Sequence, residues 1–188
     1  MDQAEIVDTA PKAAARDGLY PRPHSPLFDF EATGSGAAWI DELAEEAVRR
    51  LNEHTSPSRI VHTDWRGDNI RVDIPGERLV AVFDWDSVRA EPEAVALGGV
   101  AAMHSVDWSG PGDPYFATGD ECIDFARTVE QHRHAAYSVD EWRAIRAAIV
   151  LGWCYTARCE HARASVGDDR PQFRMRERLR TDGRRLLG

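Results

Sequence analysis

The hydrophobic pattern of the chain changes its period twice, and this change limits the folds that are open to it. Apolar residues recur every three or four positions between Ser35 and His54, which predicts a helix that ends where Ser-Pro-Ser follows. Short apolar runs at 59–62, 69–74 and 78–83 are typical of strands, and Pro-Gly-Glu forms a turn between the last two. After them the pattern is helical to the end. The sequence therefore predicts an α+β fold, with a small β-hairpin in a mainly helical chain.

Four helices are predicted after the hairpin. The first begins near Pro92, which suits an initial helical turn, and runs through the sequence AVALGGVAAM. Two more are expected at 119–136 and 139–164, and a Ser-x-x-Glu capping box opens the second of these. The Arg-rich stretch 169–187 is expected to form a final surface helix.

A length of 188 residues is enough for one domain with its own core. Residues 1–34 are expected to be weakly structured, because four prolines interrupt any periodicity in them. Residues 35–188 are expected to form the single folded domain.

Composition excludes several classes of function. A formal net charge of −9 argues against nucleic-acid binding, since neutralising phosphates requires a basic surface. No apolar run approaches the roughly 20 residues of a membrane helix, and the N-terminus lacks the apolar centre of a signal peptide. A cytoplasmic protein without membrane contact is therefore expected. Cys122, Cys154 and Cys159 are too few and too irregularly spaced for a disulfide framework or a zinc site.

Two polar clusters stand at the ends of the predicted strands. HTDWRGDN, at residues 62–69, follows the first apolar run directly, and FDWDS, at residues 83–87, closes the third. A hairpin would bring both clusters to one end of its strands. An Asp-rich hairpin end is usually a solvated turn, and Asp68 and Asn69 are ordinary turn formers. Turn formation does not, however, require Asp-Trp-Asp after an apolar strand.

Phosphoryl transfer uses side chains of these types in this arrangement. Asp64 could accept the proton of an acceptor hydroxyl, and Asn69 and Asp84 offer the hard oxygen ligands that Mg²⁺ prefers. His62 would fix the backbone of the loop. Asp86 is either a further magnesium ligand or a hydrogen-bonding partner of the loop.

The spacing His-x-Asp-x-x-x-x-Asn is similar to the catalytic loop of protein-kinase-like enzymes. Together with Asp84-Trp85-Asp86 it resembles the aminoglycoside phosphotransferase family more specifically, because that family's loop typically reads HGDxHxxN and its metal-binding Asp precedes Trp and an acid. The resemblance covers about residues 59–165. It implies the C-terminal lobe of a kinase-like fold, ATP as phosphoryl donor, Mg²⁺ as cofactor and a small hydroxyl compound as acceptor.

The chain departs from the family pattern at three positions near the loop. Thr63 replaces the usual glycine, so the loop must differ slightly from that of the family or pass through an ordinary β region. Arg66 stands where the antibiotic kinases have a His, and it either neutralises the transferring phosphoryl group or forms a surface salt bridge. Val95 stands where the family has an Asp that pins the catalytic loop, so that role is vacant or filled from elsewhere.

A larger departure from the family pattern lies at the N-terminal end of the chain. Only 58 residues precede the first predicted strand, whereas related kinases have a strand-rich lobe with a lysine that binds phosphates. Lys12 is the single lysine, and its proline-flanked position does not suit that role. The expectation is a C-terminal lobe alone: a fragment, a truncated product, or a lobe completed by a separate N-terminal lobe or by a second copy.

The acceptor side is less defined by the sequence. An acidic and aromatic strip follows the metal motif and suits a cationic or polyhydroxylated acceptor, or else is a solvated loop; it consists of Asp107, Trp108, Asp113, Tyr115, Asp120 and Glu121. Polar residues at 158–161 could also reach an acceptor cleft. Trp65 and Trp85 are interpreted as packing residues rather than stacking platforms.

Two other classes of function remain open. A catalytically impaired, pseudokinase-like binding module would account for the missing lobe and for Val95. A metal-dependent hydrolase would use His62, Asp64, Asp84 and Asp86 directly as ligands, although such sites usually contain more histidines.

The missing nucleotide-covering lobe leads to a prediction about ATP binding. Positioning supplies most of the acceleration in phosphoryl transfer, so the chain alone should bind Mg-ATP weakly. We expect calorimetric titration to give a dissociation constant well above the micromolar range. Micromolar affinity of this chain by itself would contradict the prediction.

Overall fold

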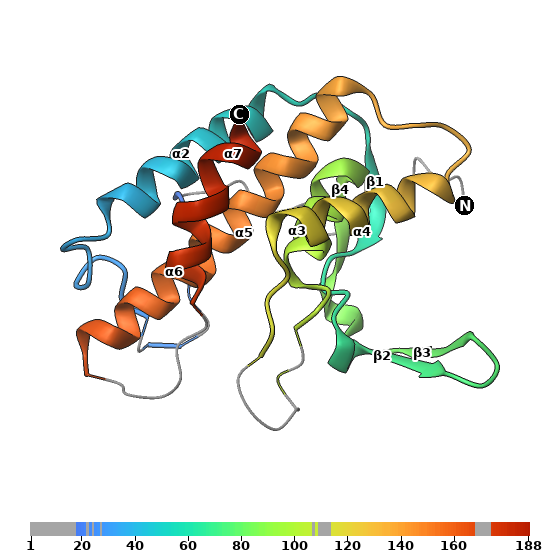
Figure 1. Ribbon diagram of the computed structural model, residues 1–188, viewed down its shortest axis with the longest axis horizontal. Coiled ribbons are helices and arrows are strands. Elements are labelled where there is room, and N and C mark those ends of the chain that lie inside the picture. Colours follow the sequence, from blue (N-terminus) through green and yellow to red (C-terminus); the bar gives the residue numbers. More distant parts are fainter. Residues whose placement is uncertain are drawn as a thin grey trace.

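The computed structural model describes residues 18–21, 23, 25–26, 28–106, 108, 114–167 and 174–188. Four longer helices form the body of the protein (Figure 1): α2 (Ala38–Glu53), α3 (Glu93–Met103), α4 (Gly119–Gln131) and α5 (Val139–Ser165). Two short helices follow, α6 (Met175–Arg178) and α7 (Arg184–Leu187). The strands are β1 (Ser58–His62), β2 (Ile70–Asp73), β3 (Arg78–Val82) and β4 (Val88–Pro92). This agrees with the predicted α+β class.

Helix α5 is the centre of the helical body. It has 27 residues, and more than half of them are buried, so its apolar surface is not limited to one stripe. Both α2 and α3 pack against it (Figure 1), and α2 buries Ile40 and Ala44 in the shared core. The body is thus arranged around a helix that is enclosed on several sides.

Helices α3 and α5 approach each other most closely at Gly98. A Cβ atom at this position would lie 2.3 Å from the carbonyl oxygen of Ile145 and 2.6 Å from the Cβ of Ala148. Since the first of these is a backbone atom, it could move only with helix α5 itself. A Cβ atom added to Gly99, the next residue, would have no neighbouring atom within 4 Å. The sequence Gly-Gly in α3 therefore contains one glycine that the packing requires and one that it does not.

The strands form two separate antiparallel pairs. β1 pairs with β4, in a register that runs from Ser58 opposite Pro92 to His62 opposite Val88. The sequence predicted helix directly after the third strand, and this was wrong, because β4 intervenes. Residues 88–92 form a strand only because they pair with residues 58–62, and the local sequence pattern gives no sign of this pairing. β4 leads directly into α3 and so joins the β1–β4 pair to the helical body.

The β2–β3 hairpin was predicted from the sequence and is present with slightly shorter strands. Figure 1 shows it extending away from the helical body. Its main contacts beyond itself are with the short 3₁₀ helix η1 (Gly67–Asn69) that precedes β2. The 63–69 loop lies between β1 and β2, so it stands where the two strand pairs meet.

The C-terminal segment differs from the predicted surface helix. Its described part consists of α6, a π-helical turn at Leu179–Gly183, and α7. Met175, Leu179, Leu186 and Leu187 are buried in the core. Their spacing places them on one side of the helical segment, which faces the core, and a π-helical turn interrupts the α-helix between them. Helix α4 likewise ends at Gln131, five residues before its predicted end.

Arg158, a fully buried residue of α5, ties the segment before α2 to the body. Its guanidinium donates to the backbone carbonyls of Thr33 (3.2 Å) and Phe30, and its Nε lies 3.2 Å from a carboxylate oxygen of Asp41. The Tyr20 hydroxyl donates to the same Asp41 oxygen at 2.8 Å. A buried guanidinium requires such partners, since an unpaired charge in the interior is costly.

The polar residues next to Arg158 also make structural contacts. Glu160 is buried and accepts from the backbone N–H of Arg176 at 2.9 Å, and His161 Nε2 lies 2.9 Å from the carbonyl oxygen of Ser35. The suggestion that residues 158–161 reach an acceptor cleft was therefore wrong. They connect α5 to the segments on either side of the body.

The three cysteines are free and buried. Burial raises the pKa of the Cys122 thiol to about 12 and that of Cys159 to about 11. These thiols are thus unsuited to nucleophilic chemistry. No described helix is both long and apolar enough to cross a lipid bilayer.

The two glycines of α3 give a matched pair of substitutions. Gly98→Ala should destabilise the protein by about 2 kcal/mol or more, because the added methyl group overpacks a helix crossing. Gly99→Ala should be neutral or stabilise by up to about 1 kcal/mol, since alanine has the higher helix propensity. Urea denaturation of both variants measures the difference. Equal stabilities would contradict the close crossing at Gly98.

Candidate active site

The 63–69 loop and the 83–87 turn after β3 meet at the base of the hairpin. Asn69, the last residue of η1, is buried and lies between the two segments. Its Nδ2 donates to Asp64 Oδ2 at 2.8 Å and to the Asp64 carbonyl at 3.0 Å. The same nitrogen lies 3.5 Å from Asp84 Oδ2. The structure therefore brings together Asp64, Asn69 and Asp84, the three residues that the sequence proposed as base and magnesium ligands.

His62 joins the same two segments through both of its ring nitrogens. Nε2 lies 2.9 Å from the carbonyl oxygen of Phe83, and Nδ1 accepts from the backbone N–H of Asp64 at 3.2 Å. Because an N–H can only donate, Nδ1 must be the unprotonated nitrogen and Nε2–H donates to Phe83. Neither nitrogen is left for a metal ion. This geometry opposes the metal-dependent hydrolase, in which His62 was a ligand, and agrees with a role in fixing the loop backbone.

Thr63 and Ser87 form a second connection. Both the backbone N–H of Thr63 (3.2 Å) and its Oγ1 (2.9 Å) donate to the carbonyl oxygen of Ser87. Thr63 is not among the described residues with positive φ, so the loop passes through an ordinary region, as expected. Val95 packs against the hydrophobic core. The loop is therefore pinned by the Ser87 carbonyl, and the departure from glycine to threonine supplies one of the hydrogen bonds.

Arg66 forms ion pairs within the loop. Its Nε lies 2.8 Å from Asp64 Oδ1, and its Nη1 lies 3.3 Å from Asp68 Oδ2. The Arg66 side chain is only 19% exposed, so this pair is more shielded than an ordinary surface salt bridge. Both oxygens of Asp64 thus have a donor, Arg66 on one side and Asn69 on the other. The sequence did not distinguish a free cation from a paired one; in this structure the guanidinium is paired.

Asp84 and Asp86 form a pair of neighbouring carboxyl groups. A hydrogen bond shared with Asp86 lowers the pKa of Asp84, and Asp64, Ser87 and Arg66 lower it further. The same contact with Asp84 raises the pKa of Asp86. The two carboxylates repel each other at this distance. Their mutual repulsion is the kind that a bound cation would relieve.

Asp84 also has an unusual backbone. Its φ of 63° and ψ of 48° lie in the left-handed region, which side chains other than those of Gly, Asn and Asp rarely adopt. This conformation turns the chain sharply after β3, into the 3₁₀ helix η2 (Trp85–Ser87). Residues held in such regions cluster at functional sites. Trp85 follows and donates from Nε1 to the Val82 carbonyl at 2.9 Å, but it is 67% exposed, so its interpretation as a packing residue was wrong.

The donor set suits magnesium better than a transition metal. Within the described residues, no three His, Cys, Asp or Glu side chains are grouped to hold a metal ion. Mg²⁺ does not need such a cage, because it commonly binds one or two carboxylates and completes its shell with waters and phosphates. Asp68 Oδ1 is buried without a hydrogen-bond partner in the described part of the chain, which leaves a further oxygen at the site unsatisfied.

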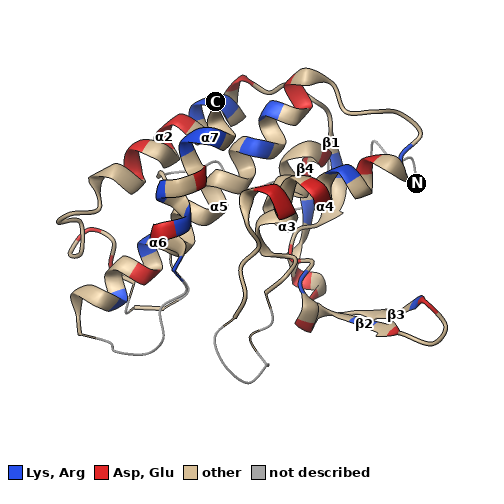
Figure 2. Ribbon diagram, in the orientation of Figure 1, with Lys and Arg blue, Asp and Glu red and all other residues tan. Residues whose placement is uncertain are grey.

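The acidic strip proposed for the acceptor is largely engaged in structure. Asp120, on α4, lies 2.8 Å from Arg185 Nη1, on α7. Figure 2 shows acidic residues on α4 and basic residues on α7. Glu121 accepts from Thr118 in a capping box and from the Tyr115 hydroxyl, and the Tyr115 contact, followed by those with Thr118, lowers the pKa of Glu121 to about 2. Asp107 and Asp113 lie outside the described residues.

An apolar cavity of about 420 Å³ lies beside the 63–69 loop. Trp65, which directly follows Asp64, lines it together with His62 and apolar residues of α3 and α4, such as Leu97, Val100 and Phe125. The Trp65 ring also meets the His62 ring edge-on, at a centroid distance of 5.8 Å. The cavity thus shares a wall with the loop that holds Asp64.

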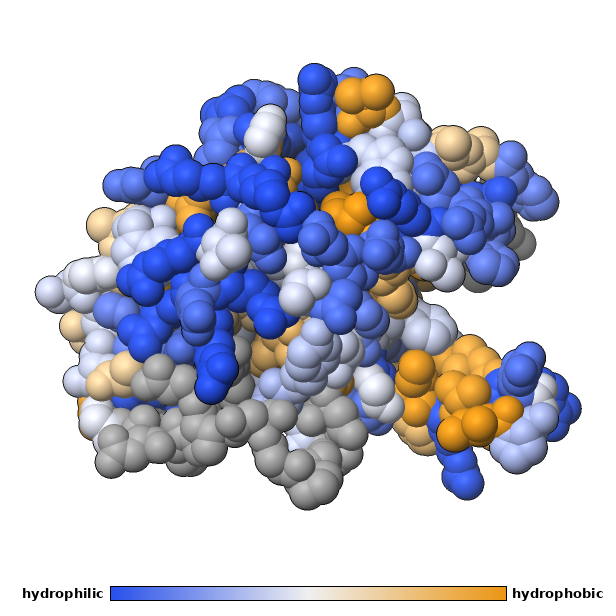
Figure 3. Space-filling view, in the orientation of Figure 1, coloured by the Kyte–Doolittle hydropathy of each residue, from blue (hydrophilic) through white to orange (hydrophobic). Residues whose placement is uncertain are grey.

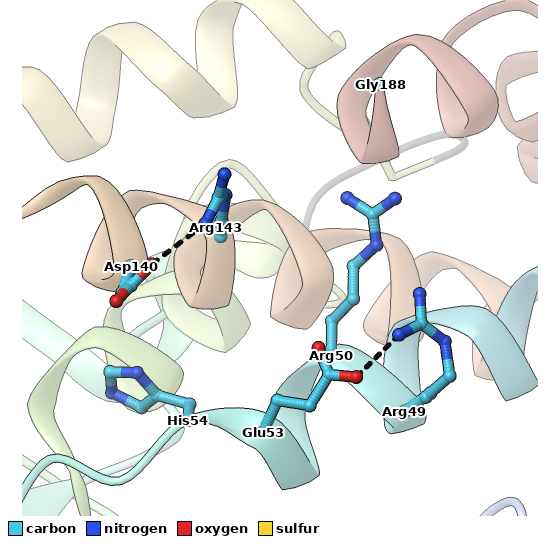
Figure 4. Close-up of a pocket in the computed structure, with 7 residues that line it drawn as sticks. All are labelled: Arg49, Arg50, Glu53, His54, Asp140, Arg143 and Gly188. Carbon is cyan, nitrogen blue, oxygen red and sulfur yellow. Dashed lines mark hydrogen bonds and ion pairs between the residues drawn. The ribbon is translucent and has the colours of Figure 1, made fainter.

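A second cavity, of about 310 Å³, lies between the end of α2 and the start of α5. Figure 4 shows that its charged side chains pair with one another: Arg143 with Asp140, and Arg49 with Glu53. It contains no residue of the 63–69 loop or the 83–87 turn. Arg50, the third arginine of the lining, pairs with Glu46 at 2.7 Å, so each of the three arginines already has an acidic partner.

Comparison with known proteins gave one match. The model of the phosphotransferase enzyme family matches residues 13–147, which is more than half of the chain. No curated protein and no solved structure gives a significant match. The matched range contains the 63–69 loop, the hairpin, the 83–87 turn and α3, so it includes all the residues grouped at this site.

The left-handed conformation of Asp84 leads to a prediction. Asp84→Gly and Asp84→Ala both remove the carboxylate, but only glycine adopts this conformation without steric cost. The glycine variant should therefore be the more stable by about 1 kcal/mol in urea denaturation. If the alanine variant is equally stable, the turn after β3 does not need a left-handed residue.

Proposed function

Because the chain belongs to the phosphotransferase enzyme family, we propose that it transfers the γ-phosphoryl group of ATP, or another nucleoside triphosphate, to a hydroxyl group of a small molecule. The observation that supports this most directly is the grouping of Asp64, Asn69 and Asp84 around one amide nitrogen. A carboxylate for the acceptor proton and oxygen ligands for magnesium are what such a reaction requires of a protein.

Asp64 is the general base in this proposal. Arg66 and Asn69 each donate to a different oxygen of its carboxylate, which fixes the plane of the group. A carboxylate has about four acceptor positions, so these two hydrogen bonds leave room for an acceptor hydroxyl. His62 and Thr63 hold the backbone on either side of the base, and they act as positioning residues.

Asp84, Asp86 and Asn69 are the proposed magnesium ligands. When bound, the ion would neutralise charge on the phosphate oxygens of the nucleotide. Asn69 can bind a cation only through Oδ1, whereas its Nδ2 now faces Asp64 and Asp84. A divalent cation bound here would relieve the repulsion between the neighbouring Asp84 and Asp86 carboxylates.

The proposed acceptor is a small hydroxyl compound that makes apolar contacts. Asp120 and Glu121 are already paired, so they do not supply free negative charge for a cationic acceptor. The cavity lined by Trp65 and Leu97 instead offers apolar surface next to the loop. An acceptor with a hydroxyl at one end and an apolar group at the other fits these surroundings.

A binding module without catalysis is the second candidate. One observation favours it: the 2.8 Å ion pair with Arg66 engages the carboxylate that would have to take the proton. This candidate predicts nucleotide or acceptor binding without turnover. Measuring ADP formation and binding on the same preparation separates the two functions.

Substitution of Asp64 tests the proposed function. With Mg-ATP and a panel of small hydroxyl compounds, Asp64→Asn should reduce ADP formation by at least about 100-fold, because general-base catalysis contributes roughly that much. Folding should change little, since the residue stands at a hairpin end. Asp140→Asn, which removes an exposed carboxylate on α5, is the matched control and should leave turnover unchanged. Full activity of Asp64→Asn would remove Asp64 as the base.

A further inference from the structure

The β2–β3 hairpin exposes an unusual amount of apolar surface. Its side chains form the hydrophobic patch on the projecting arm in Figure 3; the most exposed are Val72 (49%), Ile74 (81%), Leu79 (52%) and Val80 (57%). A two-stranded hairpin is at best marginally stable in water by itself, and stability requires a third strand or a packed face. Within the described residues neither is supplied. The hairpin therefore has the composition of a strand pair that another chain covers.

The two outer edges of the hairpin differ in their ability to accept another strand. In β3, Leu79 pairs with Val72 and Ala81 with Arg71, so Val80 between them has no partner and forms a bulge. A bulge bends and twists its strand and thereby protects an edge from pairing. The residues of β2 are consecutive in the register, so the extra residue lies on β3 alone. The open edge suited to pairing is thus that of β2.

The sequence along this edge is self-complementary. Residues 70–74 read Ile-Arg-Val-Asp-Ile, so a two-fold axis through Val72 would place isoleucine opposite isoleucine at both ends. The same axis would place Arg71 of each copy opposite Asp73 of the other. Opposite charges that face each other across antiparallel strands are stabilising, and like charges are destabilising. From these observations we propose that two copies of the chain pair antiparallel along β2, with Val72 at the two-fold axis.

The charges on this edge are free to form those contacts. Arg71 is exposed and makes no ion pair with another described residue, and Asp73 has only a 3.5 Å contact with the exposed Arg78. Two intermolecular ion pairs would therefore form without breaking a strong one. Main-chain hydrogen bonds between the edges supply affinity, as in other cases of strand addition.

The pairing joins two hairpins into one four-stranded sheet. Ile70 and Val72 lie two residues apart on β2 and so share a face, which in the dimer both copies would contribute to the central two strands; Ile74 follows directly after the end of the strand. β2 begins directly after Asn69, so the two candidate sites would be connected through a single sheet. The inference does not depend on the proposed phosphotransferase activity, since it concerns only the edge of the hairpin.

Charge reversal and mixing test this arrangement. Arg71→Asp places Asp opposite Asp at both pairs, and Asp73→Arg places Arg opposite Arg. By sedimentation equilibrium, each variant alone should dimerise on the order of tenfold more weakly than the natural chain, or not at all. An equal mixture of the two variants should form a heterodimer within about threefold of the original affinity, because both pairs are then Asp opposite Arg.

A matched control and two outcomes complete the test. Arg127→Asp makes the same change of charge on the exposed face of α4 and should leave dimerisation unchanged. Recovery in the mixture shows that both variants are folded, so loss of pairing alone cannot be ascribed to unfolding. A natural chain that is monomeric at hundreds of micromolar would overturn the proposal and leave the hairpin for a different partner. Failure of the mixture to recover would overturn the pairing about Val72.

Discussion

The close crossing of α3 and α5 at Gly98 determines where the candidate site lies. Through it, α3 sits directly on the central helix, and β4 runs into α3 without a linking loop. β1 pairs with β4 along its whole length and ends at His62. The position of the 63–69 loop is therefore set by one helix contact and one strand pair, with the rest of the body supporting α5.

Within the site, backbone carbonyls do most of the positioning. His62 donates to the carbonyl of Phe83, and Thr63 donates twice to that of Ser87. These hydrogen bonds join the loop to the turn after β3 without any charged side chain. The charged groups are then placed close together: Asp64 with Arg66, and Asp84 with Asp86. Such crowding stabilises a fold little, and it is more readily understood as an arrangement for binding a cation and an anionic substrate.

The β2–β3 hairpin is much less supported by the rest of the molecule than the loop and turn at its base. Its strands contact mainly each other, and its apolar residues remain exposed. A sheet of two strands does not shield its own faces, so its stability depends on what covers it. The bulge at Val80 interrupts β3, whereas the residues of β2 are consecutive in the register, and bulges are one way in which proteins protect an edge from pairing.

The sequence alone determined the α+β class, the hairpin strands, the main helices and the family. It also identified Asp64, Asn69 and Asp84, because polar groups at fixed positions after apolar strands are visible in the order of residues. Local patterns did not reveal β4, the broken C-terminal helix, the structural use of Arg158 or the pairing of Arg66. Each of these depends on contacts between residues distant in the chain, or on which of several partners a charge selects. Tertiary structure alone decided that Thr63 and the Ser87 carbonyl pin the loop where Val95 does not, since only folding brings their atoms within hydrogen-bonding distance.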